Sequence, residues 1–195
     1  MSYYTESELR ELGIKDFGER VRISHKASIY GAKNITVGSD VRIDDFCVVS
    51  AGEGGIELGS FIHVAVYSSI IGKGQIVLGD FSNISSRVSI YSSSDDYSGA
   101  WMTNPTVPEE FTGVHNAPVK IGRHTIIGAG SIILPGVTIE DGVAIGALSL
   151  VKKRCIEFGV YAGIPVKRIA KRKRNILDLE RLFLERLGAA KNNPQ

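Results

Sequence analysis

A few side chains in this sequence have the chemistry of proton transfer. A neutral imidazole can remove a proton from a hydroxyl or an amine, and a nearby carboxylate can orient that imidazole or bind hydroxyl groups. We expect His63 to be such a base, with Asp95 or Asp96 polarising it or binding the acceptor, and His115 is an almost equal alternative. Each also has a structural interpretation, because Asp favours turns and many histidines are simply solvated. The full set is His25, His63, His115, His124, Asp95 and Asp96.

The elements that must position these residues follow from a repeat of six residues. A period of six fits neither a helix nor a two-faced strand, but it fits short strands joined at tight corners, three to a triangular turn. One aliphatic side chain of each strand then points into a shared core, and successive turns stack about 4.8 Å apart. The clearest run is Ile121, Ile127, Ile133, Ile139, Ile145 and Val151, preceded by Val37, Ile43, Val49, by Leu58, Val64, Ile70, and by Leu78, Ile84, Ile90.

This repeat predicts an all-β solenoid and places some candidates side by side. His63 ends the hexapeptide 58–63 and therefore stacks over Asn83, which ends the hexapeptide 78–83. We expect both to face one groove, with Asn83 binding the acceptor. Small residues recur where a Cβ would crowd a corner: Gly38, Gly59, Gly79, Gly122, Gly128 and Gly146.

Breaks in the repeat predict loops. Residues 51–55 and 72–74 read as small bulges, whereas residues 92–118 form a long loop with three prolines and few aliphatic residues. A loop of this length in a regular solenoid is more often functional than accidental. We expect Tyr97, Trp101 and Asn104 to bind the acceptor, although loop aromatics equally often anchor a loop.

The two ends of the chain read as helices. Residues 4–17 predict a short capped helix, with Thr5 or Ser7 as N-cap and Gly13 as the stop, so residues 1–19 would cap the solenoid. The solenoid would span residues 20–172, and residues 173–195 would form a C-terminal α-helix and tail. Within 175–189, one helical face carries Ile176, Leu179, Leu182, Phe183 and Leu187.

Composition excludes several classes of protein. Lys and Arg number 23 against 21 Asp and Glu, a formal charge of +2 that is too small to argue for nucleic acid. Cys47 and Cys155 lack CxxC spacing, and no start of the secretory type is present, so we expect a cytoplasmic protein with reduced thiols. No apolar run reaches the roughly 18–20 residues needed to cross a bilayer, so no membrane span is expected.

The hexapeptide pattern, the late run 121–151 and the ending at residues 160–169 together resemble the hexapeptide-repeat acyltransferases. That family includes the galactoside, maltose and xenobiotic acetyltransferases, and the resemblance covers about residues 20–172. Residues 92–99 and 102–108 are most similar to the sugar O-acetyltransferases of polysaccharide and O-antigen clusters. The resemblance implies a left-handed parallel β-helix, a homotrimer, acetyl-CoA as co-substrate without a metal, and an acceptor loop that crosses the subunit interface.

The resemblance also implies a CoA groove along the late turns. Backbone groups of Gly128, Ala129, Gly146 and Ala147 would line it, and Lys152, Lys167 and Arg168 would bind the CoA phosphates, unless they form a solvated basic face. In the galactoside and xenobiotic enzymes the base is a histidine near the start of the long loop. Here Asp95 or its neighbours occupy the matching place, which leaves the base open among His63, His115, Asp95 and Asp96.

The expected reaction is therefore transfer of an acetyl group from acetyl-CoA to a hydroxyl of a sugar or nucleotide-linked sugar. N-acetylation of a nucleotide-linked amino sugar is the nearest alternative, because both use the same groove. A non-catalytic assembly subunit is a third interpretation. A zinc-dependent lyase is a fourth, but it needs three histidines on one metal, and only His115 and His124 lie close in sequence.

Overall fold

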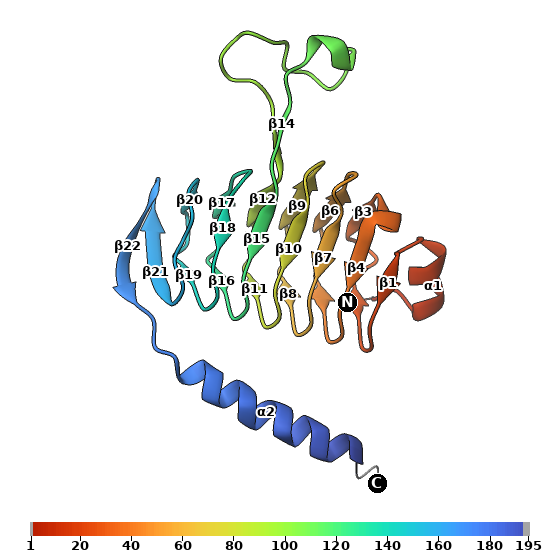
Figure 1. Cartoon of the computed structure of the whole chain (residues 1–195). Helices are drawn as coiled ribbons and strands as arrows, with labels where there is room; N and C mark the ends of the chain where they lie inside the picture. The colour runs from red at the N-terminus through yellow and green to blue at the C-terminus, as the bar shows by residue number, and fades with distance from the viewer. Residues whose placement is uncertain (1, 193–195) are drawn as a thin grey trace.

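A computed structural model describes residues 2–192, and its body is a parallel β-solenoid of about seven turns (Figure 1). Every complete turn contributes one short strand to each of three sheets, so the cross-section is a triangle. The strands pair in parallel register with the turns before and after. This confirms the left-handed parallel β-helix that was expected.

The three sheets are named here in the order in which the chain visits them. Sheet I contains β1 (Asp16–Phe17), β4 (Ile35–Val37), β7 (Ile56–Leu58), β10 (Ile76–Leu78), β15 (Val119–Ile121) and β18 (Thr138–Ile139). Sheet II contains β2 (Arg22–Ile23), β5 (Arg42–Ile43), β8 (His63–Val64), β11 (Asn83–Ile84), β16 (Ile126–Ile127), β19 (Ala144–Ile145), β21 (Gly159–Gly163) and β22 (Val166–Lys171). Sheet III contains β3 (Ser28–Tyr30), β6 (Val48–Ala51), β9 (Ser69–Gly72), β12 (Ser89–Tyr91), β17 (Ile132–Ile133) and β20 (Leu150–Val151). The corners are called I–II, II–III and III–I.

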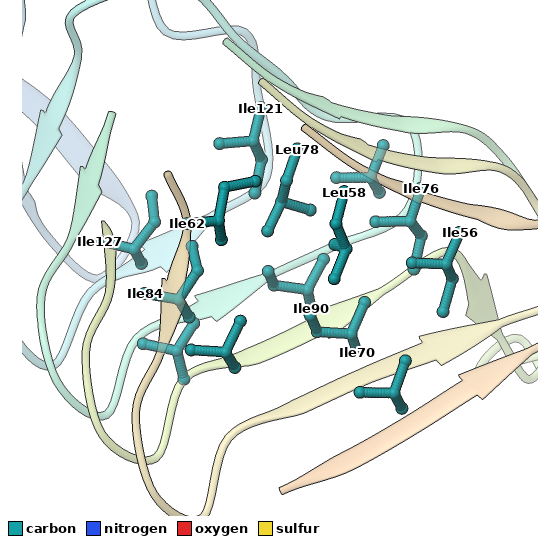
Figure 2. Close-up of a cluster of buried hydrophobic side chains, with 14 of the residues drawn as sticks. Ile56, Leu58, Ile62, Ile70, Ile76, Leu78, Ile84, Ile90, Ile121 and Ile127 are labelled. Atoms are coloured by element: carbon teal, nitrogen blue, oxygen red, sulfur yellow. The ribbon is translucent and has the colours of Figure 1, made fainter. Parts of the chain in front are cut away.

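The core lies inside the triangle and consists of the aliphatic residues of the repeat. Every member of the run from Ile121 to Val151 is at most 3% exposed. Leu58, Leu78 and Ile121 occupy the same register position on successive strands of sheet I, and Figure 2 shows them stacked along the solenoid. The six-residue period thus reports the burial of one side chain per strand.

The corner glycines are required by close approach of the next turn. A Cβ on Gly38 would lie 2.6 Å from the carbonyl carbon of Gly59, and none of the six predicted corner glycines has a positive φ. The left-handed position comes two residues after each of the first four glycines, where Asp40, Phe61, Phe81 and His124 adopt φ of 55° to 61°. The prediction that a Cβ would crowd the corner is confirmed.

The insertions all leave the solenoid at corner III–I. Residues 51–55 and 72–74 connect strands of sheet III to sheet I, and so does the long loop between β12 and β15. The base of that loop is a two-stranded ladder of β13 (Ser93–Ser94) and β14 (His115–Asn116), and it also contains the 3₁₀ turn Glu109–Phe111. Figure 1 shows the loop projecting well beyond the solenoid.

The N-terminal helix α1 spans Glu6–Glu11, shorter than the predicted range of 4–17. Of the two predicted caps, Thr5 is the N-cap, because its hydroxyl accepts from the Glu8 N–H while the Glu8 carboxylate accepts from the Thr5 N–H. Gly13 follows the helix with φ of +81°. β1 already belongs to sheet I, so the first strand of the solenoid precedes residue 20.

The C-terminal helix α2 spans Asn175–Asn192 and runs back along corner I–II (Figure 1). Phe61, Phe81 and His124 stack on that corner, and the Phe183 ring meets the first two edge-on. Leu179, predicted to share the packed face, is 62% exposed. Among residues 2–192, no helix is long and apolar enough to cross a membrane.

Candidate functional site

His63 and Asn83 lie side by side on sheet II, as their spacing predicted. β8 pairs with β11 so that His63 is directly opposite Asn83, on the strand positions whose side chains point away from the core. Both residues are partly exposed. The repeat was enough to establish this neighbourhood.

The carboxylate that orients His63 is Asp44, and the expected contact with Asp95 or Asp96 is absent within the chain that the structure describes. His63 Nε2 lies 2.9 Å from Asp44 Oδ2, and Arg42 Nε donates to Asp44 Oδ1 at 2.6 Å. The Asp44 side chain is only 6% exposed. The long loop leaves corner III–I, whereas His63 lies on the opposite sheet, so an intrachain contact is impossible. Asp44 was missed, although the pairing of Arg42 with His63 places it one turn from that histidine.

A cavity of about 340 Å³ lies where the long loop meets the solenoid. It brings together two predicted site residues, Asp95 and Asn104, and adds Lys73 and Glu109. Lys73 Nζ is 2.8 Å from Glu109 Oε1, which ties the loop to the preceding turn. His115 stands nearby, opposite Ser94 in the β13–β14 ladder.

Asp96 has a different role from its neighbour because its carboxylate folds the loop. It accepts hydrogen bonds from the Ser98 hydroxyl at 2.8 Å and from the backbone N–H groups of Gly99 at 2.9 Å and Ala100 at 3.1 Å. The Ser98 bonds, together with those from the backbone, lower the pKa of Asp96. A carboxylate held ionised in this way is a weak proton acceptor at neutral pH.

The two aromatic residues of the loop, Trp101 and Tyr97, differ in their surroundings. The Trp101 ring packs so closely on Gly113 that a Cβ there would lie 2.5 Å from it. Tyr97 is 94% exposed. Trp101 therefore anchors the loop, while Tyr97 is available to a ligand or to another chain.

The four residues expected to line the CoA groove gather on corner II–III. Gly128 and Ala129 follow β16, and Gly146 and Ala147 follow β19, one turn later. A Cβ on Gly128 would lie 2.4 Å from the Ala147 nitrogen, so the turns touch backbone to backbone. The N–H groups of Ala129 and Ala147 donate no hydrogen bond within residues 2–192. The corner therefore presents a strip of free donors flanked by small side chains.

The predicted basic residues are distributed over two corners. Lys167 pairs with Ala162 in the β21–β22 hairpin, so it lies at the end of the small-residue strip. Arg168 pairs with Tyr161, further along β22, and Lys152 follows β20 at corner III–I. Lys152 is therefore apart from the other two.

Two histidines are already engaged in structural contacts. His124 Nε2 is 2.8 Å from Glu180 Oε2, and His25 Nδ1 is 2.7 Å from the Ser2 hydroxyl. His115, by contrast, is exposed on the long loop. Within residues 2–192 no group of three or more His, Cys, Asp or Glu side chains could hold a metal ion.

The loop cavity and the strip of free donors lie at the same level along the solenoid. The long loop joins β12 to β15, and Ala129 follows β16 in the same turn as β15. They occupy different corners of the triangle, however: III–I for the cavity and II–III for the strip. A ligand in one therefore cannot reach the other within a single chain.

Known proteins share both the repeat and the whole fold. A family model described as bacterial transferase hexapeptide (six repeats) matches residues 118–153. The dTDP-4-amino-4,6-dideoxy-D-glucose acyltransferase of Escherichia coli is 57% identical over 183 residues, which cover 94% of this chain and 95% of that protein. The putative lipopolysaccharide biosynthesis O-acetyl transferase WbbJ of Escherichia coli is 30% identical over 76% of this chain and 74% of its own length.

Solved structures agree with this assignment. AntD, an N-acyltransferase from Bacillus cereus, is 43% identical in its complex with dTDP and 3-hydroxybutyryl-CoA, with a TM-score of 0.90 over 96% of this chain and 98% of that one. A serine-to-alanine variant of AntD, with dTDP-4-amino-4,6-dideoxyglucose and CoA bound, superposes with a TM-score of 0.89 over 94% and 98% of the two chains. The chain belongs to the hexapeptide-repeat transferase family. It is an acyltransferase that uses acyl-CoA as its co-substrate.

Proposed function

We propose that this enzyme transfers an acyl group from acyl-CoA to the 4-amino group of a dTDP-4-amino-4,6-dideoxyhexose. The observation that carries the proposal is the 57% identity to an acyltransferase of that substrate, with almost complete coverage of both chains. AntD, which binds the same nucleotide sugar, supports it independently. The relatives thus favour the N-acyl alternative over the hydroxyl acceptor that the sequence analysis placed first.

The reaction requires one new bond and one proton acceptor. The amine lone pair attacks the thioester carbonyl to form the N–C bond, the C–S bond breaks, and the nitrogen proton leaves through a base to the CoA thiolate. A nitrogen that has attacked a carbonyl is much more acidic than a sugar hydroxyl, so a carboxylate is an adequate base. An amine acceptor therefore relaxes the need for a histidine.

Asp95 is the base that we propose. It lines the loop cavity, and its carboxylate makes no hydrogen bond or ion pair with the described residues, whereas the Asp96 carboxylate is saturated by the loop. Asn104, in the same cavity, would bind the sugar. His63 with its Asp44 partner, and His115, are the rivals that a variant series must test.

The strip on corner II–III would hold the donor. The free N–H groups of Ala129 and Ala147 can donate to the pantetheine amides or to the oxyanion that forms at the thioester carbonyl. Lys167 at the end of the strip would bind a CoA phosphate. Arg168 is close enough along β22 to contribute, whereas Lys152 belongs to another corner.

The arrangement of the two half-sites favours a homotrimer. Three copies around an axis parallel to the solenoid would set the loop of one chain against corner II–III of the next at the same level. Exposed apolar residues on the loop would then be covered: Tyr97, Met102, Phe111 and Val114. We place this enzyme in the cytoplasm, in the synthesis of an acylated amino sugar for a surface polysaccharide such as O-antigen.

A thiol-release assay tests the proposal. Purified enzyme is mixed with acetyl-CoA and dTDP-4-amino-4,6-dideoxyglucose, and free CoA is measured together with the mass of the product. We expect a gain of one acetyl group on nitrogen, and no release with the matched dTDP-6-deoxyhexose that carries a 4-hydroxyl. Acetylation of the hydroxyl compound alone would restore the O-acyl interpretation.

A further inference from the structure

The third residue of corner II–III forms a ridge along the solenoid with one notch in it. Phe46, Tyr67, Arg87, Gly130 and Leu148 occupy this position on successive turns, all with φ between 55° and 71°. Four of them carry large exposed side chains, and Arg87 lies over the Tyr67 ring, 5.7 Å from its centre. Gly130 alone leaves the ridge open, in the turn that also carries the long loop.

Leu148 covers this notch from the following turn. A Cβ built on Gly130 would lie 2.7 Å from Leu148 Cδ2, so the leucine side chain extends back over the glycine. Its backbone is fixed there, because the Leu148 N–H donates to the Ala129 carbonyl at 2.8 Å. The side chain is nevertheless 72% exposed, so it contributes little to the core. Leu148 shares its left-handed conformation and its exposure with the other ridge residues, but it differs from them because it covers a glycine.

The notch is where the acyl end of the co-substrate would lie. The free N–H groups of Ala129 and Ala147 flank it, and Lys167 is three strand spacings away along sheet II, about 14 Å. With a phosphate at Lys167 and the extended pantetheine arm on the strip, the thioester reaches Gly130. The acyl chain beyond the carbonyl then meets Leu148 on one side and Arg87 on the other.

We infer that Leu148, lying over Gly130, limits the size of the acyl group and selects acetyl over chains of four carbons. The inference rests on the proposed function, since it needs CoA on corner II–III. It adds a specificity-determining side chain that makes no contribution to proton transfer. A contact of this kind discriminates by excluding methylene groups, which is worth about 10- to 200-fold per group.

Leu148→Ala tests the inference with acetyl-CoA, butyryl-CoA and 3-hydroxybutyryl-CoA as probes. We expect kcat/KM for butyryl-CoA relative to acetyl-CoA to rise by about tenfold or more, because the space over Gly130 opens. Leu148→Met, which refills the space, should restore the original ratio. Phe46→Ala is the matched control, because it removes another exposed ridge side chain, four turns before Leu148, and it should leave the ratio within about twofold.

The outcomes separate the inference from the function on which it rests. An unchanged ratio in Leu148→Ala with normal acetyl transfer overturns the inference and leaves the function intact. An equal rise in Phe46→Ala also overturns it, because the effect would not be local to the notch. If the unmodified enzyme transfers no acyl group to the amino sugar, the proposed function fails first. Because Leu148 is exposed, the variant should keep the melting temperature of the parent, which a thermal scan verifies.

Discussion

Corners I–II and II–III have the same backbone shape, but they differ in whether their backbone N–H groups are hydrogen-bonded. At corner I–II, side chains of the following turn satisfy the backbone donors: the Ser39 N–H donates to Ser60 Oγ at 3.0 Å, and the Ser60 N–H donates to Asp80 Oδ1 at 2.7 Å. At corner II–III, alanines stand in the equivalent late positions and their N–H groups stay free within the described chain. Backbone donors left unpaired in a native structure call for a partner.

The two corners also differ in what covers them. Helix α2 covers corner I–II, where Phe183 packs on the stacked rings and Glu180 pairs with both Arg123 and His124. On corner II–III, the side chains of Phe46, Tyr67 and Leu148 are exposed. In the function that we propose, the chain completes corner I–II by itself, whereas a co-substrate and a neighbouring copy complete corner II–III. This difference, rather than the repeat, is what supports the proposed location of the site.

In the function that we propose, the late turns of corner II–III, the open corner, supply hydrogen-bond donors and the long loop supplies the base. Asp95→Asn should lower kcat by about 10²-fold or more, as expected for loss of a general base. Melting should be unchanged, because the Asp95 carboxylate has no partner among the described residues. His63→Ala and His115→Ala, assayed in parallel, should lose much less. A hundredfold loss in His63→Ala with an active Asp95→Asn would move the base to sheet II.

Filling the open corner should strongly reduce use of the co-substrate. Ala147→Phe places a ring on the strip where the exposed alanine now lies, and kcat/KM for acetyl-CoA should fall by about 10²-fold through displacement of the thioester. Val66→Phe adds a similar ring on the same corner but in an early turn, and it should retain most activity. Titration with acetyl-CoA by calorimetry separates lost binding from lost chemistry. Equal losses in both variants would contradict the location of the groove.

Opening the closed corner should affect stability alone. Asp80→Ala removes the acceptor of the Ser60 N–H and should lower the free energy of unfolding by about 1 kcal/mol. Asp80→Asn keeps a side-chain oxygen and should recover most of this loss. Denaturant unfolding measures both, and KM for acetyl-CoA should not change. A rise in KM would mean that the two corners are coupled.

The smallest expected effect concerns the loop that serves the open corner. Hydrogen bonds to the ionised form lower the pKa of Asp96, so its stabilisation of the loop is complete above the unfolded pKa of about 3.9. That stabilisation is lost as pH falls through the lower pKa of the folded state. Acid-tolerant proteolysis should therefore cut near Tyr97 faster only below about pH 4. Asp96→Ala should remove this pH dependence and be cut readily at every pH.

Much of the architecture could be read from the residues. The six-residue period predicted the solenoid, its core, the crowded corners and the contact between His63 and Asn83, because a stacked repeat converts sequence spacing directly into position along an axis. The resemblance to the hexapeptide-repeat acyltransferases pointed to the small residues of the late turns, and the structure places these residues together on corner II–III. The six-residue period did not predict the length of α1, the exposure of Leu179 or the position of Lys152 on another corner than Lys167 and Arg168.

Only the tertiary structure decided which corner each insertion leaves and which side chains meet there. Asp44 rather than Asp95 orients His63, because the long loop leaves corner III–I while His63 lies on sheet II. Within the loop, the Asp96 carboxylate accepts the hydrogen bonds that fold it, whereas the Asp95 carboxylate accepts none from the described residues. The spacing of aliphatic residues by itself determined the register of the turns. The triangular cross-section then decided that the donor strip and the loop cavity lie on different corners, so that, in the function that we propose, one chain holds both halves of the site without joining them.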